Sequence, residues 1–154
     1  MAERLLRAGL KRLQQTQSET LYTVFLTGLA EVLITSAQLD EALATADEAL
    51  KRTEYSNALW WMPEAMRIKG EVLLSRETDA YQAEHHFRRS LDQAHRQGVL
   101  SCELRAAISL ARMLRDRNRS ADALAILNPV YDRFTEGFET ADLKAAKALL
   151  EALR

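Results

Sequence analysis

The sequence is poor in the residues that cross-link a chain or interrupt a helix. Its 154 residues include one cysteine, Cys102, which excludes an intramolecular disulfide and any multi-cysteine metal site. A reducing compartment is therefore the simpler expectation. Five glycines and two prolines are set in a composition that is 47% hydrophobic and 28% charged. That profile is typical of a globular helical chain and leaves little room for strands.

A strong charge imbalance and long hydrophobic runs are also missing. The formal net charge is −1, so no net field attracts nucleic acid or an acidic membrane. No stretch approaches the roughly 18 consecutive apolar residues of a membrane span. The opening residues, MAERLLRAGLKRL, lack the apolar core of a signal peptide. We therefore expect a cytoplasmic, soluble protein of one domain, with neither a nucleic-acid nor a membrane partner.

What the sequence has in quantity is helical periodicity, and residues 103–138 show it most clearly. Apolar residues recur at helical spacing in both halves of this segment. They are Leu104, Ala107, Ile108, Leu110, Ala111 and Leu114, then Ala123, Leu124, Leu127, Val130 and Tyr131. The polar link 116–120 separates the halves, and Ser120 is expected to be the N-cap of the second helix. So short a link predicts an antiparallel hairpin.

The same periodicity predicts helices along the rest of the chain. They are expected at about 3–15, 19–36, 39–53, 59–75, 79–97, 100–115, 120–133 and 140–154. Pro63 falls in the first turn of the fourth helix, where its missing N–H costs little, and Gly98 marks the end of the fifth. Thr140 is expected to cap the last helix. Gly28 lies within the second helix, which we interpret as a site of close packing.

A repeat is visible when the second helix of each hairpin is aligned on its first small residue. Ala42, Ala83 and Ala123 are separated by 41 and 40 residues, a period typical of helical solenoids. The predicted fold is all-α, without strands: a tetratricopeptide-like α-solenoid of antiparallel hairpins with about eight helices. We expect a single domain, 1–154, made of a lone helix (1–17), repeats at 18–55, 58–98 and 99–134, and a capping helix (139–154).

Four segments also resemble a known family. They are RIKGEVLL (67–74), AEHHFRRSL (83–91), QGVLSCELRAAISLAR (97–112) and FTEGFETADLKAAKALL (134–150). They are similar to the tetratricopeptide-like C-terminal region of bacterial multidomain regulators, in which a P-loop ATPase, often with a nucleotide cyclase or winged-helix domain, precedes it. The resemblance implies a helical array for protein contacts or signal sensing. The chain has no G-x-x-x-x-G-K-[ST] motif, so ATPase chemistry does not carry over.

Residues that could carry chemistry have simpler structural interpretations. His85 and His86 point about 100° apart on a helix and are not at chelating distance from His95, so no metal or cofactor is expected. Cys102 has no motif around it and is expected to be a packed structural thiol. Trp60 and Trp61 either pack between hairpins or anchor a ligand or partner.

The first helix of each hairpin should turn one face toward a shared groove. By spacing, candidate groove residues are Glu31, Ile34, Trp60, Trp61, Glu64, Arg67, Glu71, Arg112 and Arg115, together with Val24, Thr27 and Ile108. A solvated charged face would have the same pattern. Arg67 and Glu71, four residues apart, could also simply pair with each other.

The sequence favours a non-enzymatic module that binds a protein or peptide partner. The alternative is a sensor that holds a small molecule in the superhelix. An open, charged groove would favour the first, and a narrow groove lined by Trp60 and Trp61 the second. The apolar strip Leu5, Leu6, Leu10 and Leu13 should bury only one flank. We expect it to form a homodimer contact or to dock an upstream domain.

Overall fold

The computed structural model describes residues 1–16, 18–56, 59–77 and 79–154, and over these residues the chain is helical without a strand. The helices are α1 (Ala2–Thr16), α2 (Glu19–Thr35), α3 (Leu39–Tyr55), the 3-10 helix η1 (Leu59–Trp61), α4 (Met62–Ser75), α5 (Ala80–Gln97), α6 (Leu100–Arg115), α7 (Ser120–Tyr131) and α8 (Ala141–Leu153). The all-α class and the count of eight α-helices are thus confirmed for this part of the chain. Residues 17, 58 and 78, which fall in expected boundaries and links, lie outside it.

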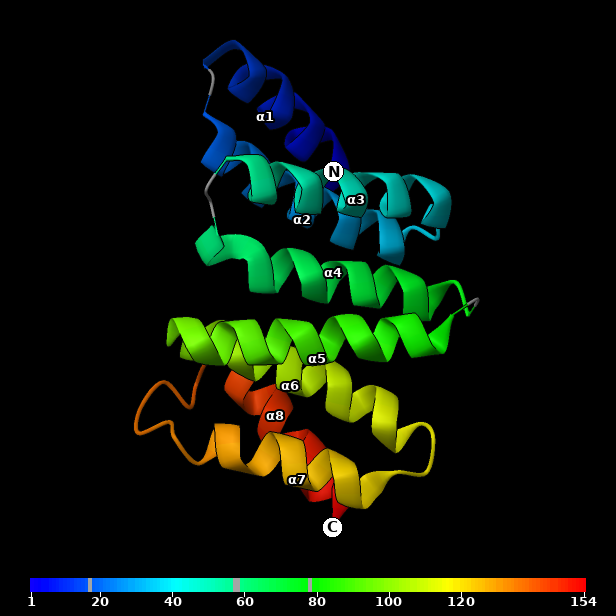
Figure 1. The fold of residues 1–154 in the computed structure, drawn as a ribbon, viewed down its shortest axis with the longest axis vertical. Helices are drawn as coiled ribbons and strands as arrows, with labels where there is room; N and C mark the ends of the chain where they lie inside the picture. Colours follow the sequence, from blue (N-terminus) through cyan, green and yellow to red (C-terminus); the bar gives the residue numbers. More distant parts are fainter. Residues whose placement is uncertain (17, 57–58, 78) are drawn as a thin grey trace.

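The helices follow one another down the long axis of the molecule (Figure 1). Each helix contacts the next one in sequence, and α2, α4, α6 and α8 also contact one another in that order. Helices α3, α5 and α7 lie in front of α2, α6 and α8 in Figure 1. The even-numbered helices therefore share one side of the molecule, and this side positions the site described below.

Apolar side chains between these helices form two clusters, one in each half of the chain. The first joins α1 to α4, and the second joins α5 to α8. Ala42, Ala83 and Ala123 are fully buried, as the repeat predicts for the residues closest to a paired helix. Two glycines allow close approaches: an added Cβ would lie 2.3 Å from the ring of Phe25 at Gly9 and 2.6 Å from the ring of Phe87 at Gly70. At Gly28 the nearest atom would be a Leu6 methyl at 3.5 Å, so the close packing expected there is only ordinary contact.

The link within each of three helix pairs contains a non-glycine residue in the left-handed conformation. These residues are Ala37 (φ 57°), Glu77 (φ 56°) and Asn118 (φ 59°), and each donates its N–H to the carbonyl three residues earlier. Such a conformation is costly for any residue with a Cβ. Its recurrence between α2 and α3, α4 and α5, and α6 and α7 gives the three pairs one local turn geometry.

The helix ends confirm most of the signals in the sequence and correct two. Gly98 ends α5 with φ 69°, and the Asp79 side chain accepts a hydrogen bond from the Gln82 N–H at 3.0 Å at its start. The expectation for Ser120 is wrong: Ser120 is the first residue of α7, and Arg119 is at the cap position without a side-chain bond. Thr140 does precede α8, but its side chain makes no capping bond. Helix α7 contains Pro129 and ends at Tyr131, two residues earlier than expected.

The leucine strip of α1 is more covered than the sequence suggested. Leu10 is buried, and Leu6 and Leu13 pack partly against the N-terminal cluster. Leu5 is 63% exposed. In the described part of the chain, none of the helices has the length and apolar character needed to cross a membrane.

Candidate functional site: a charged hollow on the even-numbered helices

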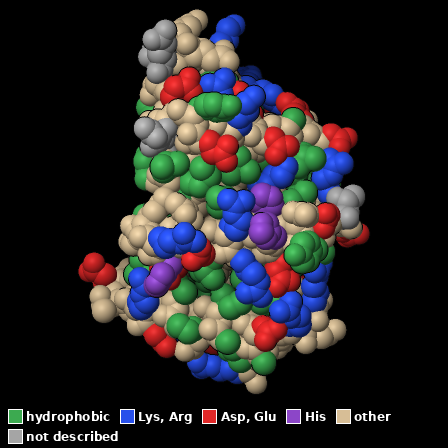
Figure 2. Space-filling view, in the orientation of Figure 1, with side chains coloured by type: hydrophobic (Ala, Val, Ile, Leu, Met, Phe, Trp, Pro, Cys, Tyr) green, Lys and Arg blue, Asp and Glu red, His purple; other side chains and the backbone are tan. Residues whose placement is uncertain are grey.

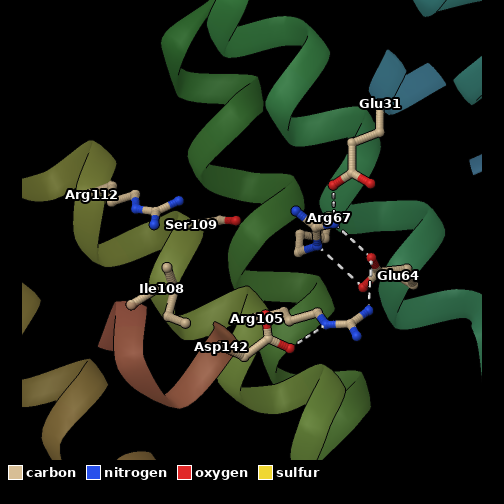
Figure 3. Close-up of a pocket in the computed structure, with 9 residues that line it drawn as sticks. Glu31, Glu64, Arg67, Arg105, Ile108, Ser109, Arg112 and Asp142 are labelled. Atoms are coloured by element: carbon tan, nitrogen blue, oxygen red, sulfur yellow. Dashed lines mark hydrogen bonds and ion pairs between the residues drawn. The ribbon is translucent and has the colours of Figure 1, made fainter. Parts of the chain in front are cut away.

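A hollow of about 340 Å³ lies on the side of the molecule shared by α2, α4, α6 and α8. We refer to it as the central hollow (Figure 3). It is lined by Glu31 of α2, Glu64 and Arg67 of α4, Arg105, Ile108, Ser109 and Arg112 of α6, and Asp142 and Ala145 of α8. Four helices far apart in sequence thus contribute to one site, and most of its lining side chains are charged.

Arg67 is at the centre of the site and is almost fully buried, with 8% exposure. Its guanidinium donates to both carboxylate oxygens of Glu64, at 2.6 and 3.2 Å, and to Glu31 Oε1 at 3.0 Å. Glu71 lies farther away, at 3.6 Å. Burial alone would lower the pKa of Arg67, but the hydrogen bonds and charge of Glu64, together with Glu31, outweigh it and raise the pKa. Arg67 is therefore a permanent cation whose main partner is Glu64, while Glu71, the possible partner suggested by the sequence, is a more distant one.

Arg105 connects the neighbouring helices across the hollow. It donates from Nε to Asp142 at 2.8 Å and lies 3.5 Å from Glu64, so it joins α6 to both α8 and α4. The hydrogen bond to Asp142 is the main reason that its pKa is raised. Arg105 and Asp142 also line an adjacent hollow of about 520 Å³ under the 132–140 loop. The Arg105–Asp142 pair therefore forms a wall between two cavities.

Arg112 differs from the other two arginines of the site. Its side chain is exposed and makes no ion pair with the described residues. It borders the same hollow as Ile108, which is buried, and Ala145, which is half-buried. Figure 3 shows its guanidinium on the far side of the site from Glu64. Among the residues that the structure describes, the site thus has a neutralised centre and an arginine without an ion pair at its edge.

The structure places the predicted groove residues in three groups. Four of those predicted from the first helices line the hollow with Ile108: Glu31, Glu64, Arg67 and Arg112. Glu71 is adjacent, since it accepts a hydrogen bond from Ser109 Oγ at 2.5 Å. Ile34 packs partly against the N-terminal cluster, and Arg115 pairs with its neighbour Asp116 at 2.8 Å. Neither of these two lines the hollow.

The two tryptophans lie at the start of α4, outside the central hollow. Trp61 is half-buried and donates from Nε1 to Thr27 Oγ1 at 3.1 Å. Trp60 is 50% exposed and packs edge-to-face on Trp61, with 5.1 Å between the ring centroids. Trp61 therefore packs between α4 and α2, while Trp60 covers it from solvent.

Sequence reasoning missed four residues of the site: Arg105, Ser109, Asp142 and Ala145. Arg105 could have been predicted from the sequence, because it lies one turn before Ile108 on the stripe that also contains Arg112. Asp142 and Ala145 were not, because α8 was interpreted as a cap. Only the contact of α8 with α6 brings these two residues to the hollow.

The remaining candidates for chemistry form no reactive arrangement in the described part of the chain. Cys102 is buried, and burial raises the pKa of its thiol, which keeps it protonated at neutral pH. The His85 and His86 rings lie edge-to-face, with 6.1 Å between centroids, and His95 bonds to Glu103 instead. No group of three or more histidine, cysteine or carboxylate side chains among the described residues could hold a metal ion.

No family model, curated protein or solved structure matches this chain. Exposed charges of both signs around a buried ion-pair network are suited to recognising another charged group.

Proposed function

We propose that this chain is a tetratricopeptide-like α-solenoid module that binds a protein segment in the central hollow. Three features support the arrangement. The even-numbered helices share one side and contact one another in order, and the left-handed link recurs in three helix pairs. Buried alanines recur at equivalent places in α3, α5 and α7. Repeat arrays of this kind stack hairpins and use the surface of one helix from each hairpin for binding.

The observation that carries the proposal is the guanidinium of Arg112, which has no ion-pair partner in the part of the chain that the structure describes. The Arg67 and Arg105 cations are already neutralised by Glu64, Glu31 and Asp142. The Arg112 guanidinium can therefore donate hydrogen bonds to a carboxylate of a binding partner. A guanidinium binds carboxylates through two parallel hydrogen bonds. Ile108 and Ala145 provide apolar contact beside it. We infer that the bound segment carries an acidic side chain next to a small apolar one.

The lining favours a protein segment over a small-molecule sensor. Ligand cavities for small molecules are mostly apolar and aromatic, with few polar groups. The central hollow is instead lined by three arginines and three carboxylates, and the tryptophan pair lies outside it. As part of the same proposal, the module is related to the sensor or interaction region of a bacterial signalling ATPase or nucleotide cyclase, and acts in the cytoplasm without catalytic activity of its own.

A selection from a library of phage-displayed dodecapeptides tests the proposal. Peptides enriched on the parent chain are expected to contain Asp or Glu and to bind Arg112→Glu at least about tenfold more weakly, because an ionic hydrogen bond is replaced by repulsion. Arg89→Glu is the matched control, since Arg89 is an exposed arginine on α5 that does not line the hollow. Equal binding to the parent and to Arg112→Glu would rule out this site.

A homodimer through α1 remains a separate prediction, and it now depends mainly on Leu5, the most exposed of the four leucines. Light scattering of the parent and of Leu5→Glu at about 100 micromolar tests it. If the parent chain stays monomeric at this concentration, the prediction of a homodimer is wrong.

A further inference from the structure

A separate hollow lies on the opposite set of helices, on the face that α3, α5 and α7 turn toward the viewer in Figure 2. Its volume is about 330 Å³. It is lined by Arg88, Leu91, Asp92 and His95 of α5, Glu103 of α6 and Val130 of α7. It has no residue in common with the central hollow, so a binding site here is independent of the function proposed above. We refer to it as the α5–α7 hollow.

The carboxylate of Glu103 lines this hollow, and only one of its two oxygens has hydrogen-bond partners among the described residues. Its exposed fraction is 3%. One oxygen, Oε1, receives hydrogen bonds from both His95 Nδ1, at 3.0 Å, and Arg133 Nη1, at 2.5 Å. The other oxygen, Oε2, is buried and has no hydrogen-bond partner among the described residues. A buried carboxylate oxygen without a donor is costly, and most such groups in proteins are satisfied.

The surroundings of Glu103 define what could supply the missing donor. A carboxylate only accepts hydrogen bonds, so the group must carry N–H or O–H donors. Asp92, which also lines the hollow, adds a second carboxylate and is bound by Arg96, and the lining cation Arg88 is paired with Glu84 at 2.7 Å. Leu91 and Val130 provide apolar walls. The side chains that bond to Glu103 are themselves surface residues, with His95 66% and Arg133 43% exposed. Because Oε2 is buried, an incoming donor must displace a neighbouring side chain to reach it.

We propose that the α5–α7 hollow binds a primary alkylammonium group. The ammonium donates to Glu103 Oε2 and to Asp92, and the alkyl chain lies against Leu91 and Val130. An ammonium has three donors and no acceptor, so it complements two carboxylates, and bonds between ionised partners are the stronger class. The same chemistry is carried by a free alkylamine and by the lysine side chain of a protein partner.

The probe is n-pentylammonium, titrated at pH 7 into the full chain and followed by the ¹H–¹⁵N amide shifts of His95, Glu103 and Val130. We expect saturable shifts at these amides and at least about tenfold weaker binding to Glu103→Gln, which loses the ionic acceptor. n-Pentanol, which has the same chain without the charge, should not compete. Nα-acetyl-lysine N-methylamide forms the second arm: if it binds too, the source is a lysine side chain, and if only pentylammonium binds, it is a free amine.

Two variants keep the test decisive. Glu48→Gln, on α3 and outside the hollow, is the matched control and should bind pentylammonium like the parent. If thermal melting shows that Glu103→Gln is unfolded, Asp92→Asn replaces it, because Asp92 is 57% exposed and can change without loss of the fold. The proposal is overturned if neither amine shifts these amides, or if the folded variants bind pentylammonium as tightly as the parent.

Discussion

The two mid-helix glycines of α2 and α4 have opposite roles, although the sequence presents them alike. A Cβ at Gly70 would lie 2.6 Å from the ring of Phe87, which is fully buried and cannot move away cheaply. A Cβ at Gly28 would meet only a Leu6 methyl at 3.5 Å. Gly70 is therefore required by packing, whereas Gly28 only reduces helix stability.

We expect opposite effects of alanine at these two positions. Gly70→Ala should lower the free energy of unfolding by about 1 to 2 kcal/mol, because overpacking of about 1 to 3 kcal/mol exceeds the gain in helix propensity. Gly28→Ala should raise it by about 0.5 to 1 kcal/mol. Urea unfolding followed by circular dichroism measures both, and two variants that shift in the same direction would contradict this packing.

His86 should make the fold less stable in mild acid. Its ring is half-buried and Nδ1 is buried without a hydrogen-bond partner among the described residues. Burial, with the nearby charge of Lys69, lowers the pKa of His86 below its ordinary value of 6.5. The unfolded chain then binds a proton that the folded chain does not, so this contribution to stability is complete above pH 6.5 and is lost as the pH falls below it.

The test compares His86→Gln with His85→Gln, its exposed neighbour. Melting temperatures at pH 7.5 and pH 5.5 should fall less on acidification for His86→Gln than for the parent, while His85→Gln should fall like the parent. The same fall in all three proteins would show that His86 is not the titrating group.

Among the helices, α4 carries the buried Arg67–Glu64 ion pair, which lines the central hollow and also contributes to the stability of the fold. Glu64 is 4% exposed and its closest cation is Arg67. Removing one member of a buried ion pair leaves an uncompensated charge, whereas replacing both with apolar residues of similar size is often neutral. The pair lies within α4 and holds Arg67 where it also bonds to Glu31 of α2.

Arg67→Met should therefore lower the free energy of unfolding by about 3 kcal/mol. Glu64→Leu combined with Arg67→Met should recover most of that loss. Arg7→Met, which breaks an exposed pair with Glu41, is the surface comparison and should cost less than about 1 kcal/mol. Chemical unfolding of the four proteins decides this, and a double variant no better than Arg67→Met would contradict the role given to the pair.

How far the sequence predicts the structure also differs between elements. Helices such as α6, with a strong apolar stripe, were predicted to within a residue, because local periodicity and tertiary burial select the same face. The N-cap of α7 was predicted one residue too late, at Ser120, because the left-handed residue Asn118 ends the link one residue earlier. Turn geometry of this kind depends on which backbone conformation the packed helices require, and the type of residue alone does not reveal it.

At the scale of the whole molecule, the sequence predicted that α2, α4 and α6 contribute to the site but missed the contribution of α8. Glu31, Glu64, Arg67 and Arg112 follow from helical spacing alone. Asp142 depends on how α8 packs on α6, a contact between elements that periodicity within one helix does not encode. The sequence suggested only Glu71 as a partner of Arg67, whereas in the structure Glu64 is closer, at 2.6 Å against 3.6 Å.

We propose that the side formed by α2, α4, α6 and α8 is the binding surface. Mapping by ¹H–¹⁵N chemical shifts where an acidic peptide selected on the parent chain binds tests this directly. We expect the largest shifts on α4, α6 and α8 around Arg67, Arg105, Arg112 and Asp142, and at least about tenfold weaker binding of the peptide to Arg112→Glu. Shifts concentrated on α3, α5 and α7, with the residues of the central hollow unmoved, would contradict it.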